Sequence, residues 1–407
     1  MRKLFFIFLV FSTVSSFSQI EIKGTVFQQN GPLENVAVYL NNTMLGTTTD
    51  ENGEFSISVK PGQYDLIVSY LGFKKINYAL NTANYLKPLV FALVEDDEML
   101  DEIIIKKTVY DDEWKYNLAE FKKEFIGKSE LSKDCEIKNP EVLHFEYNAL
   151  ENILTAYARK PIEIYHKGLG YSIIYELEHF ERNKNYVSYL GYSRYQELKG
   201  NKRKQKRWLA NRLKTYNGSY VHFYQSLLKG TTYKDGFLIH LFKRVPNPER
   251  PSEAEIKKAR ELVRLSLPTI NFTEKITVPK NALDSARVLL KKVKLPKYKD
   301  NIYKSKAPIT DIFSKKNMRN YLNIEYNILV VYTKEKEEIG YIKRSVFSKM
   351  REAYPQSSSV IPLKKPSVID RNGLLVNPLD VYYEGYWSYK KFANALPLDY
   401  SPVDSSQ

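Results

Sequence analysis

Closely spaced turn signals divide the first part of the chain into short runs in which apolar and polar residues alternate. The signals are Asn30-Gly31-Pro32, Asn52-Gly53 and Pro61-Gly62. Short alternating runs between such signals are typical of antiparallel strands, and strands this short must assemble into sheets to bury a core. The predicted strands are Ile22–Phe27, Ala37–Leu40, Gly46–Thr49, Glu54–Val59 and Tyr64–Tyr70.

Two of these segments show one clear core face. Apolar residues occupy every second position of Val36–Leu40 and of Phe55–Val59. Because successive side chains of a strand point to opposite faces, this alternation predicts a small antiparallel sandwich. Asn52-Gly53 can adopt the positive φ angles of a tight turn, so we predict a plain hairpin at Asp50–Phe55. The alternative, a calcium loop, lacks the later bidentate Glu of that motif.

The chain starts with the pattern of a secretory signal peptide. Arg2 and Lys3 precede an apolar run at Leu4–Val10, and Ser16-Phe17-Ser18 offers small residues for cleavage. The apolar run is too short to cross a bilayer, no later run approaches the roughly 20 residues of a helical span, and no cysteine follows for a lipid anchor. We therefore predict export to the periplasm or outer membrane, or secretion, with no transmembrane span after signal removal. The alternative is an N-terminal buried strand.

Charge is distributed unevenly along the chain. Residues 19–105 contain five Lys and twelve Asp or Glu, a net charge of −7. The whole chain carries +15 and the predicted signal peptide holds +2 of it, so residues 106–407 carry +20. A segment this basic attracts anions, which in a cell envelope are lipid phosphates, acidic glycans and acidic proteins. Because the chain is predicted to be exported, nucleic acid is not the expected partner.

Seven phrases spread over about residues 20–94 form a recognisable pattern. They are Gly24-Thr25-Val26, Gly31-Pro32-Leu33, Val36-Ala37-Val38, Gly46-Thr47-Thr48-Thr49-Asp50, Gly53-Glu54-Phe55, Pro61-Gly62-Gln63-Tyr64 and Ser69-Tyr70-Leu71-Gly72-Phe73. The pattern resembles the carboxypeptidase-regulatory-like domain, a transthyretin-like sandwich common in exported proteins of Bacteroidetes. That domain accompanies carboxypeptidases without being their catalytic unit. The resemblance therefore implies an interaction or spacer module.

An acidic linker at Glu95–Glu98 is followed by Leu100-Asp101-Glu102 and the β-branched residues Ile103-Ile104-Ile105. In large TonB-dependent nutrient receptors a similar sandwich precedes a similar run, a plug and a barrel. The rest of this chain is too short for a plug and a barrel of about 22 strands. We predict a closing strand and linker, and an energy-coupling contact is the alternative.

The remainder of the chain is predicted to be an α+β domain with an antiparallel sheet and a few helices. Helical periodicity marks Glu113–Ile126, Trp208–Leu228 with a kink or break at Gly218, and Glu253–Leu265 with Ser252 as N-cap. Alternation within Tyr171–His179 predicts an antiparallel sheet with one face exposed to solvent, and Glu176 belongs to that face. The predicted strands are Val142–Tyr147, Leu154–Ala158, Ile162–Tyr165, Tyr171–His179, Tyr186–Gln196, Asn323–Tyr332 and Ile339–Lys343, and Arg244–Pro251 is a proline-rich break.

Several phrases of this larger part form a second pattern. They are Phe125-Ile126-Gly127, Cys135 with Asn139-Pro140, Gly168-Leu169-Gly170-Tyr171, Arg212 with Tyr216-Asn217-Gly218-Ser219 and His222-Phe223, Gly236-Phe237, and Gly385-Tyr386-Trp387 through Leu396-Pro397-Leu398-Asp399-Tyr400. They resemble an uncharacterised Bacteroidetes family that carries the same N-terminal sandwich. This resemblance implies no known activity.

The sequence contains no recognised catalytic pattern. A zinc carboxypeptidase needs a His followed three residues later by Glu, and none of the five histidines is followed in this way. Cys135 is the only cysteine, so no internal disulfide is possible, and Asp134 and Glu136 disfavour its thiolate. Nucleophile-elbow, phosphate-loop and dinucleotide motifs are also missing. We predict no catalytic residue, metal or cofactor, although paired carboxylates for hydrolysis leave no sequence signature.

Two groups of residues are candidates for binding. Arg212, Tyr216, Ser219 and His222 are spaced by four, three and three residues, so one helix brings them together as a polar anion pocket with Arg212 as bidentate donor. The alternative is structural, with Tyr216 packed on the sheet and with Arg212 and His222 satisfying buried carbonyls. The second group is Lys202-Arg203-Lys204-Gln205-Lys206-Arg207, which attracts phosphate-bearing polymers or is a solvated loop or helix start.

These features predict a signal peptide at residues 1–18, the sandwich at 19–94, an acidic linker and strand at 95–108 and a basic α+β domain at 109–407. We expect an exported, non-enzymatic envelope protein whose sandwich is an interaction or spacer module. Its basic domain is expected to bind an anionic envelope lipid or glycan, or an outer-membrane protein. The alternatives are a carboxylate-based hydrolase of envelope glycans or peptides, and an accessory to a TonB-dependent uptake receptor.

Overall fold

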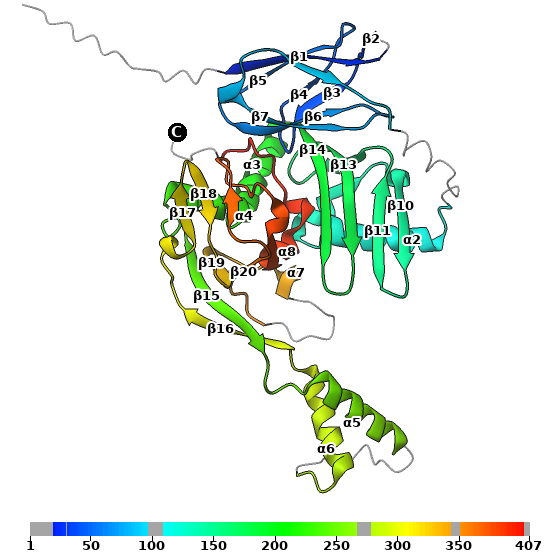
Figure 1. Cartoon of the computed structure of the whole chain (residues 1–407), viewed down its shortest axis with the longest axis vertical. Coiled ribbons are helices and arrows are strands. Elements are labelled where there is room, and N and C mark those ends of the chain that lie inside the picture. The colour runs from blue at the N-terminus through cyan, green and yellow to red at the C-terminus, as the bar shows by residue number, and fades with distance from the viewer. Residues whose placement is uncertain (1–18, 30, 97–108, 267–277, 343–350, 403–407) are drawn as a thin grey trace, which may run out of the picture.

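A computed structural model describes residues 19–29, 31–96, 109–266, 278–342 and 351–402. The N-terminal sandwich lies at one end of the molecule, and two larger β-rich units lie side by side beneath it (Figure 1). A helical hairpin projects from the opposite end (Figure 1). Each β-rich unit encloses its own cluster of buried apolar side chains. The predicted fold class, an all-β sandwich followed by a larger α+β part, is confirmed. The predicted signal peptide and the run at Leu100–Ile105 lie outside the described residues.

The sandwich consists of two four-stranded sheets whose facing sides form the core. The first sheet contains β1 (Ile20–Gln28), β2 (Gly31–Pro32), β5 (Glu54–Val59) and β8 (Leu89–Ala92), with β8 parallel to β1. The second contains β4 (Gly46–Thr48), β3 (Ala37–Leu40), β6 (Gln63–Ser69) and β7 (Ile76–Asn81), in that order. A 3-10 turn, η1 (Thr82–Asn84), lies between β7 and β8. The alternation that predicted a core face in β5 is confirmed, because its apolar residues are buried.

The predicted hairpin at Asp50–Phe55 is wrong. The strand before this turn, β4, pairs with β3, whereas the strand after it, β5, pairs with β1. The turn therefore carries the chain from one sheet to the other. Asp50 Oδ1 accepts hydrogen bonds from the backbone N–H groups of Asn52 at 2.9 Å and Glu54 at 2.8 Å, and Gly53 adopts a φ of +71°. The local signal predicted the turn, but strand pairing depends on distant residues.

The second unit is a six-stranded antiparallel sheet with one helix on it. Its strands are β9 (Cys135–Ile137), β10 (Leu143–Asn148), β11 (Ile153–Ala158), β12 (Ile162–His166), β13 (Tyr171–Arg182) and β14 (Val187–Glu197). One edge of β13 pairs with β14, and β12 and β11 share the other. Helix α2 (Asp112–Phe125) contributes Phe121 and Phe125 to the core, as its periodicity predicted. The 3-10 turns η2 (Glu130–Asp134) and η3 (Pro140–Val142) flank β9.

The third unit contains a five-stranded and a three-stranded sheet. The larger sheet has the order β16 (Tyr298–Lys304), β15 (Phe237–Pro246), β19 (Asn327–Lys336), β20 (Pro355–Pro362) and β22 (Val381–Gly385). The smaller sheet has the order β17 (Phe313–Lys316), β18 (Arg319–Leu322) and β21 (Ser367–Ile369). The projecting hairpin, α5 (Glu253–Leu265) and α6 (Ala282–Lys291), is inserted between the paired strands β15 and β16. Ser252 caps α5 in a capping box, which confirms the predicted N-cap.

Three predictions concern the segments that connect the sheets, and the structure confirms one of them and corrects the other two. The break predicted at Gly218 separates α3 (Lys202–Tyr216) from α4 (Tyr220–Lys229). The predicted strand at Ile339–Lys343 is wrong, because Ile339–Ile342 forms the short helix α7. The break predicted to begin at Arg244 begins later, because β15 continues to Pro246. The remaining short elements are η5 (Lys292–Lys294), η6 (Ile309–Asp311), η7 (Pro378–Asp380), α8 (Tyr386–Lys390) and η8 (Phe392–Asn394).

The sandwich packs on the second unit through a buried polar contact. Glu176 of β13 is only 7% exposed and accepts hydrogen bonds from Tyr39 Oη and Ser69 Oγ, both at 2.8 Å. Lys75 Nζ lies 3.4 Å from the same carboxylate. Asn42 N also donates to a backbone carbonyl of β14 at 2.7 Å. The face of the sheet that carries Glu176 was predicted to be wet, and this is wrong at Glu176, because the sandwich covers it there.

Candidate functional site

The middle of α3 clamps the turn between β12 and β13. Four of its side chains donate hydrogen bonds to the backbone carbonyls of residues 167–170. These donors are Arg207, Trp208, Asn211 and Arg212, which share one helix face because they lie about one turn apart. Trp208 Nε1 bonds to Lys167 O at 2.8 Å, and Arg212 Nε bonds to Leu169 O at 2.8 Å. The clamp fixes the position of α3 on the second unit.

Arg212 is fully engaged in this clamp. Its side chain is buried, its Nη1 donates to the carboxylate of Glu197, and its Nη2 donates to Gly170 O at 3.3 Å. The guanidinium carbon also lies 3.9 Å from the centre of the Tyr171 ring, a cation–π contact. Each guanidinium nitrogen therefore has a partner within the protein, as in the structural alternative for this residue.

Ser219 and His222 belong to the turn between α3 and α4. Ser219 Oγ accepts from His222 N at 3.1 Å and caps α4, while His222 Nδ1 accepts from Gly218 N at 3.2 Å. Because Nδ1 is an acceptor, the neutral ring carries its proton on Nε2, which lies 3.9 Å from Asp235 Oδ2. The ring stacks on Tyr216 with 4.7 Å between centroids. Burial, partly offset by the charge of Asp235, lowers the pKa of His222 to about 4.

The structure does not bring the four predicted pocket residues together. Arg212 faces the β12–β13 turn, whereas His222 faces the α3–α4 turn and the rings of Phe237 and Tyr332. The predicted spacing assumed one continuous helix. Gly218, at a φ of +70°, ends that helix and removes the shared face. Arg212 is therefore separated from the α3–α4 turn, where Tyr216, Ser219 and His222 stay in contact with one another.

The basic run lies on α3, at its exposed N-terminal end. Its cations are Lys202, Arg203, Lys204, Lys206 and Arg207. Among the described residues none of them has an ion-pair partner, since the ion pairs of α3 are made by Arg212 and Lys214, and the first turn contains no acid. Positive side chains at a helix N-terminus oppose the macrodipole, and like charges three or four residues apart repel. An anion bound here would relieve both effects.

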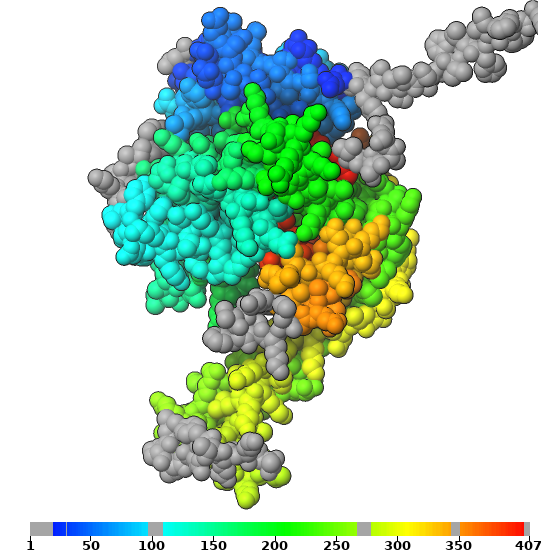
Figure 2. Space-filling view, turned by 180° about the vertical axis from the view of Figure 1, so that it is seen from behind, coloured from blue at the N-terminus to red at the C-terminus, as the bar shows by residue number. Residues whose placement is uncertain are grey.

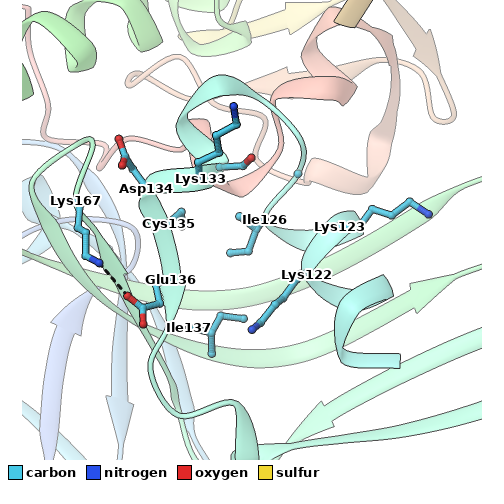
Figure 3. Close-up of a pocket in the computed structure, with 11 residues that line it drawn as sticks. Lys122, Lys123, Ile126, Lys133, Asp134, Cys135, Glu136, Ile137 and Lys167 are labelled. Carbon is cyan, nitrogen blue, oxygen red and sulfur yellow. Dashed lines mark hydrogen bonds and ion pairs between the residues drawn. The ribbon is translucent and has the colours of Figure 1, made fainter. Parts of the chain in front are cut away.

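A hollow of about 320 Å³ lies between α2 and β9 (Figure 3). Its charged lining residues are Lys122, Lys123, Lys133, Lys167, Asp134 and Glu136. Glu136 is paired with Lys138 at 3.1 Å and with Lys167 at 3.2 Å, and hydrogen bonds from these two lysines lower its pKa. Lys122 extends toward the same side of the hollow (Figure 3) and has no ion-pair partner among the described residues. The hollow therefore holds more positive than negative charge.

Cys135 forms part of the wall of this hollow (Figure 3). Burial, together with the charge of Asp134, raises the pKa of its thiol to about 12. The thiol is therefore protonated near neutral pH, and a protonated thiol is a poor nucleophile. The hollow's described lining includes no histidine that could act as its base.

Lys167 connects the hollow to the basic end of α3. Its side chain lines the hollow, while its carbonyl accepts hydrogen bonds from Arg207 Nη2 at 3.1 Å and from Trp208 Nε1 at 2.8 Å. We define the cationic surface as Lys202–Arg207, Lys167 and Lys122. Figure 2 shows α3, in bright green, exposed beside the turquoise of the second unit. Sequence reasoning found the helical part of this surface. It missed Lys167 and Lys122, which join it only through the fold.

A smaller hollow of about 220 Å³ lies where η2, α3 and the C-terminal segment meet. Its charged lining residues are Glu130, Asp134, Glu338, Lys214 and Lys390. Lys214 pairs with Glu130 at 3.2 Å, and Lys390 pairs with Glu338 at 3.0 Å. Both hollows thus contain more than one carboxylate, so the hydrolase alternative stays a prediction.

The buried histidine His166 is held by the backbone. Its Nε2 lies 2.9 Å from Ala393 O, and its Nδ1 accepts from Leu169 N at 3.2 Å. Across the residues that the structure describes, no three or more His, Cys, Asp or Glu side chains are grouped to hold a metal ion. No helix in the same described ranges has the length and apolar character needed to cross a membrane.

Comparison with known proteins identifies the first domain. Residues 22–105 match the family model of the CarboxypepD_reg-like domain, so the chain contains a domain of this family, as the sequence resemblance indicated. TonB-dependent receptor P39 of Formosa agariphila is 31% identical over 105 residues, which are 25% of this chain and 10% of the receptor. The chain therefore spans about a tenth of the length of this relative. The resemblance of later residues to an uncharacterised family stays a prediction.

Among solved structures, the comparison finds a 9R-lipoxygenase from Cyanothece PCC8801. The alignment covers 51% of this chain and 48% of the lipoxygenase, at 9% sequence identity and a TM-score of 0.14. A similarity this low carries no argument about fold or function.

Proposed function

We propose that this chain is an exported cell-envelope protein that binds a phosphate-bearing envelope polymer on the cationic surface. The observation that carries the proposal is the set of five exposed α3 cations that lack ion-pair partners in the described chain. They lie beside a hollow in which Lys122 is also unpaired among the described residues. A cluster of this kind attracts polyvalent anions at long range, with a strength that falls as salt rises.

The arrangement of the cations favours an extended anion over a small one. The bidentate donor Arg212 is occupied by backbone carbonyls and Glu197, and Lys167 is already paired with Glu136. The unpaired cations are instead spread along α3, where each residue adds about 1.5 Å of length, and continue past Lys167 to Lys122. A polymer contacts several of them together, whereas a single phosphate contacts one or two.

The basic end of α3 also opposes the stability of its own helix. Acidic residues in the first turn would interact favourably with the helix dipole and would pair with cations four residues later. The chain instead carries Lys202 and Arg203 there. Residues that reduce stability without a structural reason are typical of binding surfaces, where function sets the side chain.

The test replaces the two cations of the first turn. We expect Lys202→Glu with Arg203→Glu to raise the free energy of unfolding by about 1 kcal/mol, because the new carboxylates complement the dipole and pair with Lys206 and Arg207. We expect the same variant to lose at least about tenfold in affinity for long-chain inorganic polyphosphate, since reversing two charges lowers the net charge of the contact surface by four units. Fluorescence anisotropy at low salt measures binding, and urea unfolding measures stability.

Two controls make this test specific. Lys316→Glu with Arg319→Glu reverses the same charge on exposed residues of β17 and β18, and affinity should change less than about twofold because screening weakens distant charges. Arg212→Lys should lower stability by about 2 kcal/mol while leaving affinity unchanged, because lysine cannot reproduce the guanidinium fork. No polyphosphate binding at low salt, or equal losses in both charge-reversal pairs, would refute the proposal.

A second candidate, contact with an outer-membrane uptake receptor, rests on the similarity to part of TonB-dependent receptor P39. We infer that such a contact would use the sandwich, because residues 22–105 match the CarboxypepD_reg-like domain. Co-purification of a TonB-dependent receptor with the tagged full chain from gently solubilised outer membranes tests this candidate. Its absence under conditions that retain the tagged chain in the membrane fraction would count against it.

A further inference from the structure

The smaller hollow lies at the junction of the two larger β-rich units. Helix α8, which ends at its wall, runs between these units (Figure 1). Two hydrogen bonds hold the junction: Ala393 N donates to Ile126 O at 3.0 Å, and Glu130 N donates to the Glu338 carboxylate at 2.9 Å. Ligand sites are found preferentially at junctions of this kind, where the walls come from separately packed units.

Two polar side chains in the lining of this hollow have no hydrogen-bond partner within the described protein. Thr215 of α3 is only 4% exposed, and its Oγ1 is buried without a partner. The Nδ2 and Oδ1 atoms of Asn394, the last residue of η8, are likewise buried and unpartnered. Most buried polar atoms of proteins are hydrogen-bonded, because an unpaired one costs free energy. A molecule bound in the hollow would supply the missing partners.

The charges of the lining leave one carboxylate uncompensated. Lys214 is paired with Glu130 and Lys390 with Glu338, at 3.2 and 3.0 Å. Asp134 lines the same hollow and has no ion-pair partner among the described residues. The described lining thus carries one more negative than positive charge, and it favours a ligand that brings a cation to Asp134.

We propose that the smaller hollow binds a small α-amino acid in its zwitterionic form. The ammonium group of the ligand donates to Asp134, and its carboxylate accepts from Thr215 Oγ1 and Asn394 Nδ2. A volume of about 220 Å³ corresponds to about seven waters of roughly 30 Å³ each, which suits a ligand of few atoms. Leu131 is the one apolar residue in the described lining, so the side chain of the ligand is short. The proposal is independent of polymer binding on the cationic surface.

Other small molecules fit this lining less well. A phosphate or another simple anion would be repelled by the uncompensated carboxylate of Asp134. A neutral sugar or water alone could bond to Thr215 and Asn394, but neither brings a positive charge. A metal ion lacks its ligands, because the described residues include no group of three or more His, Cys, Asp or Glu side chains that could hold one. A zwitterion supplies both the cation and the acceptor.

The test is isothermal titration calorimetry of the full chain with glycine, L-alanine and L-serine. Two matched probes each lack one charge: lactate has no ammonium group, and ethanolamine has no carboxylate. We expect the tightest of the three amino acids to bind at least about ten times more strongly than either probe, because each probe forfeits a charge-assisted hydrogen bond.

Substitutions at the two ends of the site separate binding from a structural role. Thr215→Val keeps the shape and removes the hydroxyl, so amino-acid affinity should fall about tenfold. The urea midpoint of this variant should stay the same or rise, since the lost hydroxyl has no partner inside the protein, whereas a structural hydroxyl would lower it. Asp134→Asn should lower amino-acid affinity about tenfold and leave the weaker binding of lactate unchanged.

Two controls make these expectations specific. Asp112→Asn removes a carboxylate from an exposed position of α2, and amino-acid affinity should change less than about twofold. Lys202→Glu with Arg203→Glu should lose polyphosphate while keeping the amino acid, and Thr215→Val should do the reverse. The two binding proposals can therefore fail separately.

Three outcomes would overturn the proposal. The first is that none of the three amino acids binds at millimolar concentration, which would mean that the hollow holds only water. The second is that lactate or ethanolamine binds as tightly as the amino acids, because the two charges would then not be recognised together. The third is that Thr215→Val and Asp134→Asn both leave amino-acid affinity unchanged, which would place the binding site elsewhere on the chain.

Discussion

At the residue scale, most of the polar side chains that were candidates for binding form hydrogen bonds with backbone groups of the protein. Arg212 holds the carbonyls of the β12–β13 turn, and His222 accepts the N–H of Gly218. Such buried groups must find partners inside the protein, because an unpaired one costs about 1–3 kcal/mol. Residues with free bonding capacity are found instead on the surface, as Lys202 and Arg203 are.

His222 makes stability depend on pH in a defined window. Its pKa is lowered to about 4 in the folded chain, against about 6.5 when unfolded. Between these values the unfolded chain binds a proton that the folded chain does not, so the contribution is complete above about pH 6.5 and is lost as pH falls toward 4. We expect stability at pH 5 to be about 2 kcal/mol below that at pH 7 from this group alone.

Urea unfolding across this pH range checks the expectation against His222→Asn, whose side-chain oxygen can still accept from Gly218 N. The variant loses the packing of the ring and should be less stable at every pH. The stability that it loses between pH 7 and pH 5 should, however, be about 2 kcal/mol smaller than in the original chain. Burial also lowers the pKa of His166, so some slope remains in both proteins. Identical slopes would show that His222 does not titrate as inferred.

At the element scale, the break between α3 and α4 depends on Gly218. Its φ is +70°, and an added Cβ would lie 2.5 Å from Tyr332 Cδ1 and 2.8 Å from Gln356 Oε1. Gly230 has nearly the same φ, +69°, but open space where a Cβ would lie. The two glycines therefore share the conformational requirement and differ in packing.

We expect Gly218→Ala to lower the free energy of unfolding by about 2–4 kcal/mol, from left-handed strain and overpacking together. Gly230→Ala should lower the free energy of unfolding by only about 1 kcal/mol, because it adds left-handed strain without overpacking. Urea unfolding at neutral pH measures both. Equal losses would mean that the structure around Gly218 relaxes and that its close packing does not matter.

The same scale shows what sequence patterns could predict. α2 and α5 were found almost to the residue, because periodicity and caps are local signals. The helix at Ile339–Ile342 was missed, since four apolar and small residues carry no usable period. The prediction of a hairpin at Asp50–Phe55 was wrong for a different reason. The turn is a local feature of the sequence, but β4 and β5 pair with strands of different sheets.

The candidate surface was predictable in part for the same reason. The basic end of α3 is contiguous in sequence, so composition alone revealed it. Lys167 comes from a turn that the clamp made by Trp208 and Arg207 holds beside α3, and Lys122 comes from another helix that lines the same hollow as Lys167. Conversely, the predicted grouping of Arg212 with His222 assumed a continuous helix, which Gly218 ends.

At the scale of the whole molecule, the sandwich is an integral part of the structure and not a freely attached spacer. Tyr39, on the second sheet of the sandwich, points away from the sandwich core and is still buried. Its hydroxyl donates a hydrogen bond to Glu176 of the second unit. Burial alone would lower the pKa of Lys75, but hydrogen bonds and charges from Glu178 and Glu176 offset this and raise it. This contribution to stability is complete below about pH 10 and is lost as pH rises through the raised value.

Removing Glu176 should therefore weaken the contact between the sandwich and the second unit. We expect Glu176→Ala to lower the free energy of unfolding by about 3 kcal/mol, because it leaves the buried Tyr39 hydroxyl without its acceptor and takes one carboxylate from Lys75. Glu176→Gln keeps an oxygen acceptor and should lose less. Glu178→Ala removes the more exposed carboxylate near Lys75 and should lose under about 1 kcal/mol.

Urea unfolding gives the three losses, and hydrogen exchange shows where they act. In Glu176→Ala, exchange should accelerate on both sides of the contact, in β3 and β6 of the sandwich and in β13 and β14 of the second unit, because these strands meet there. Acceleration confined to one side would mean that Glu176 stabilises only its own sheet. In that case the sandwich would be held mainly by the two backbone bonds that Asn42 and Thr43 make with β14.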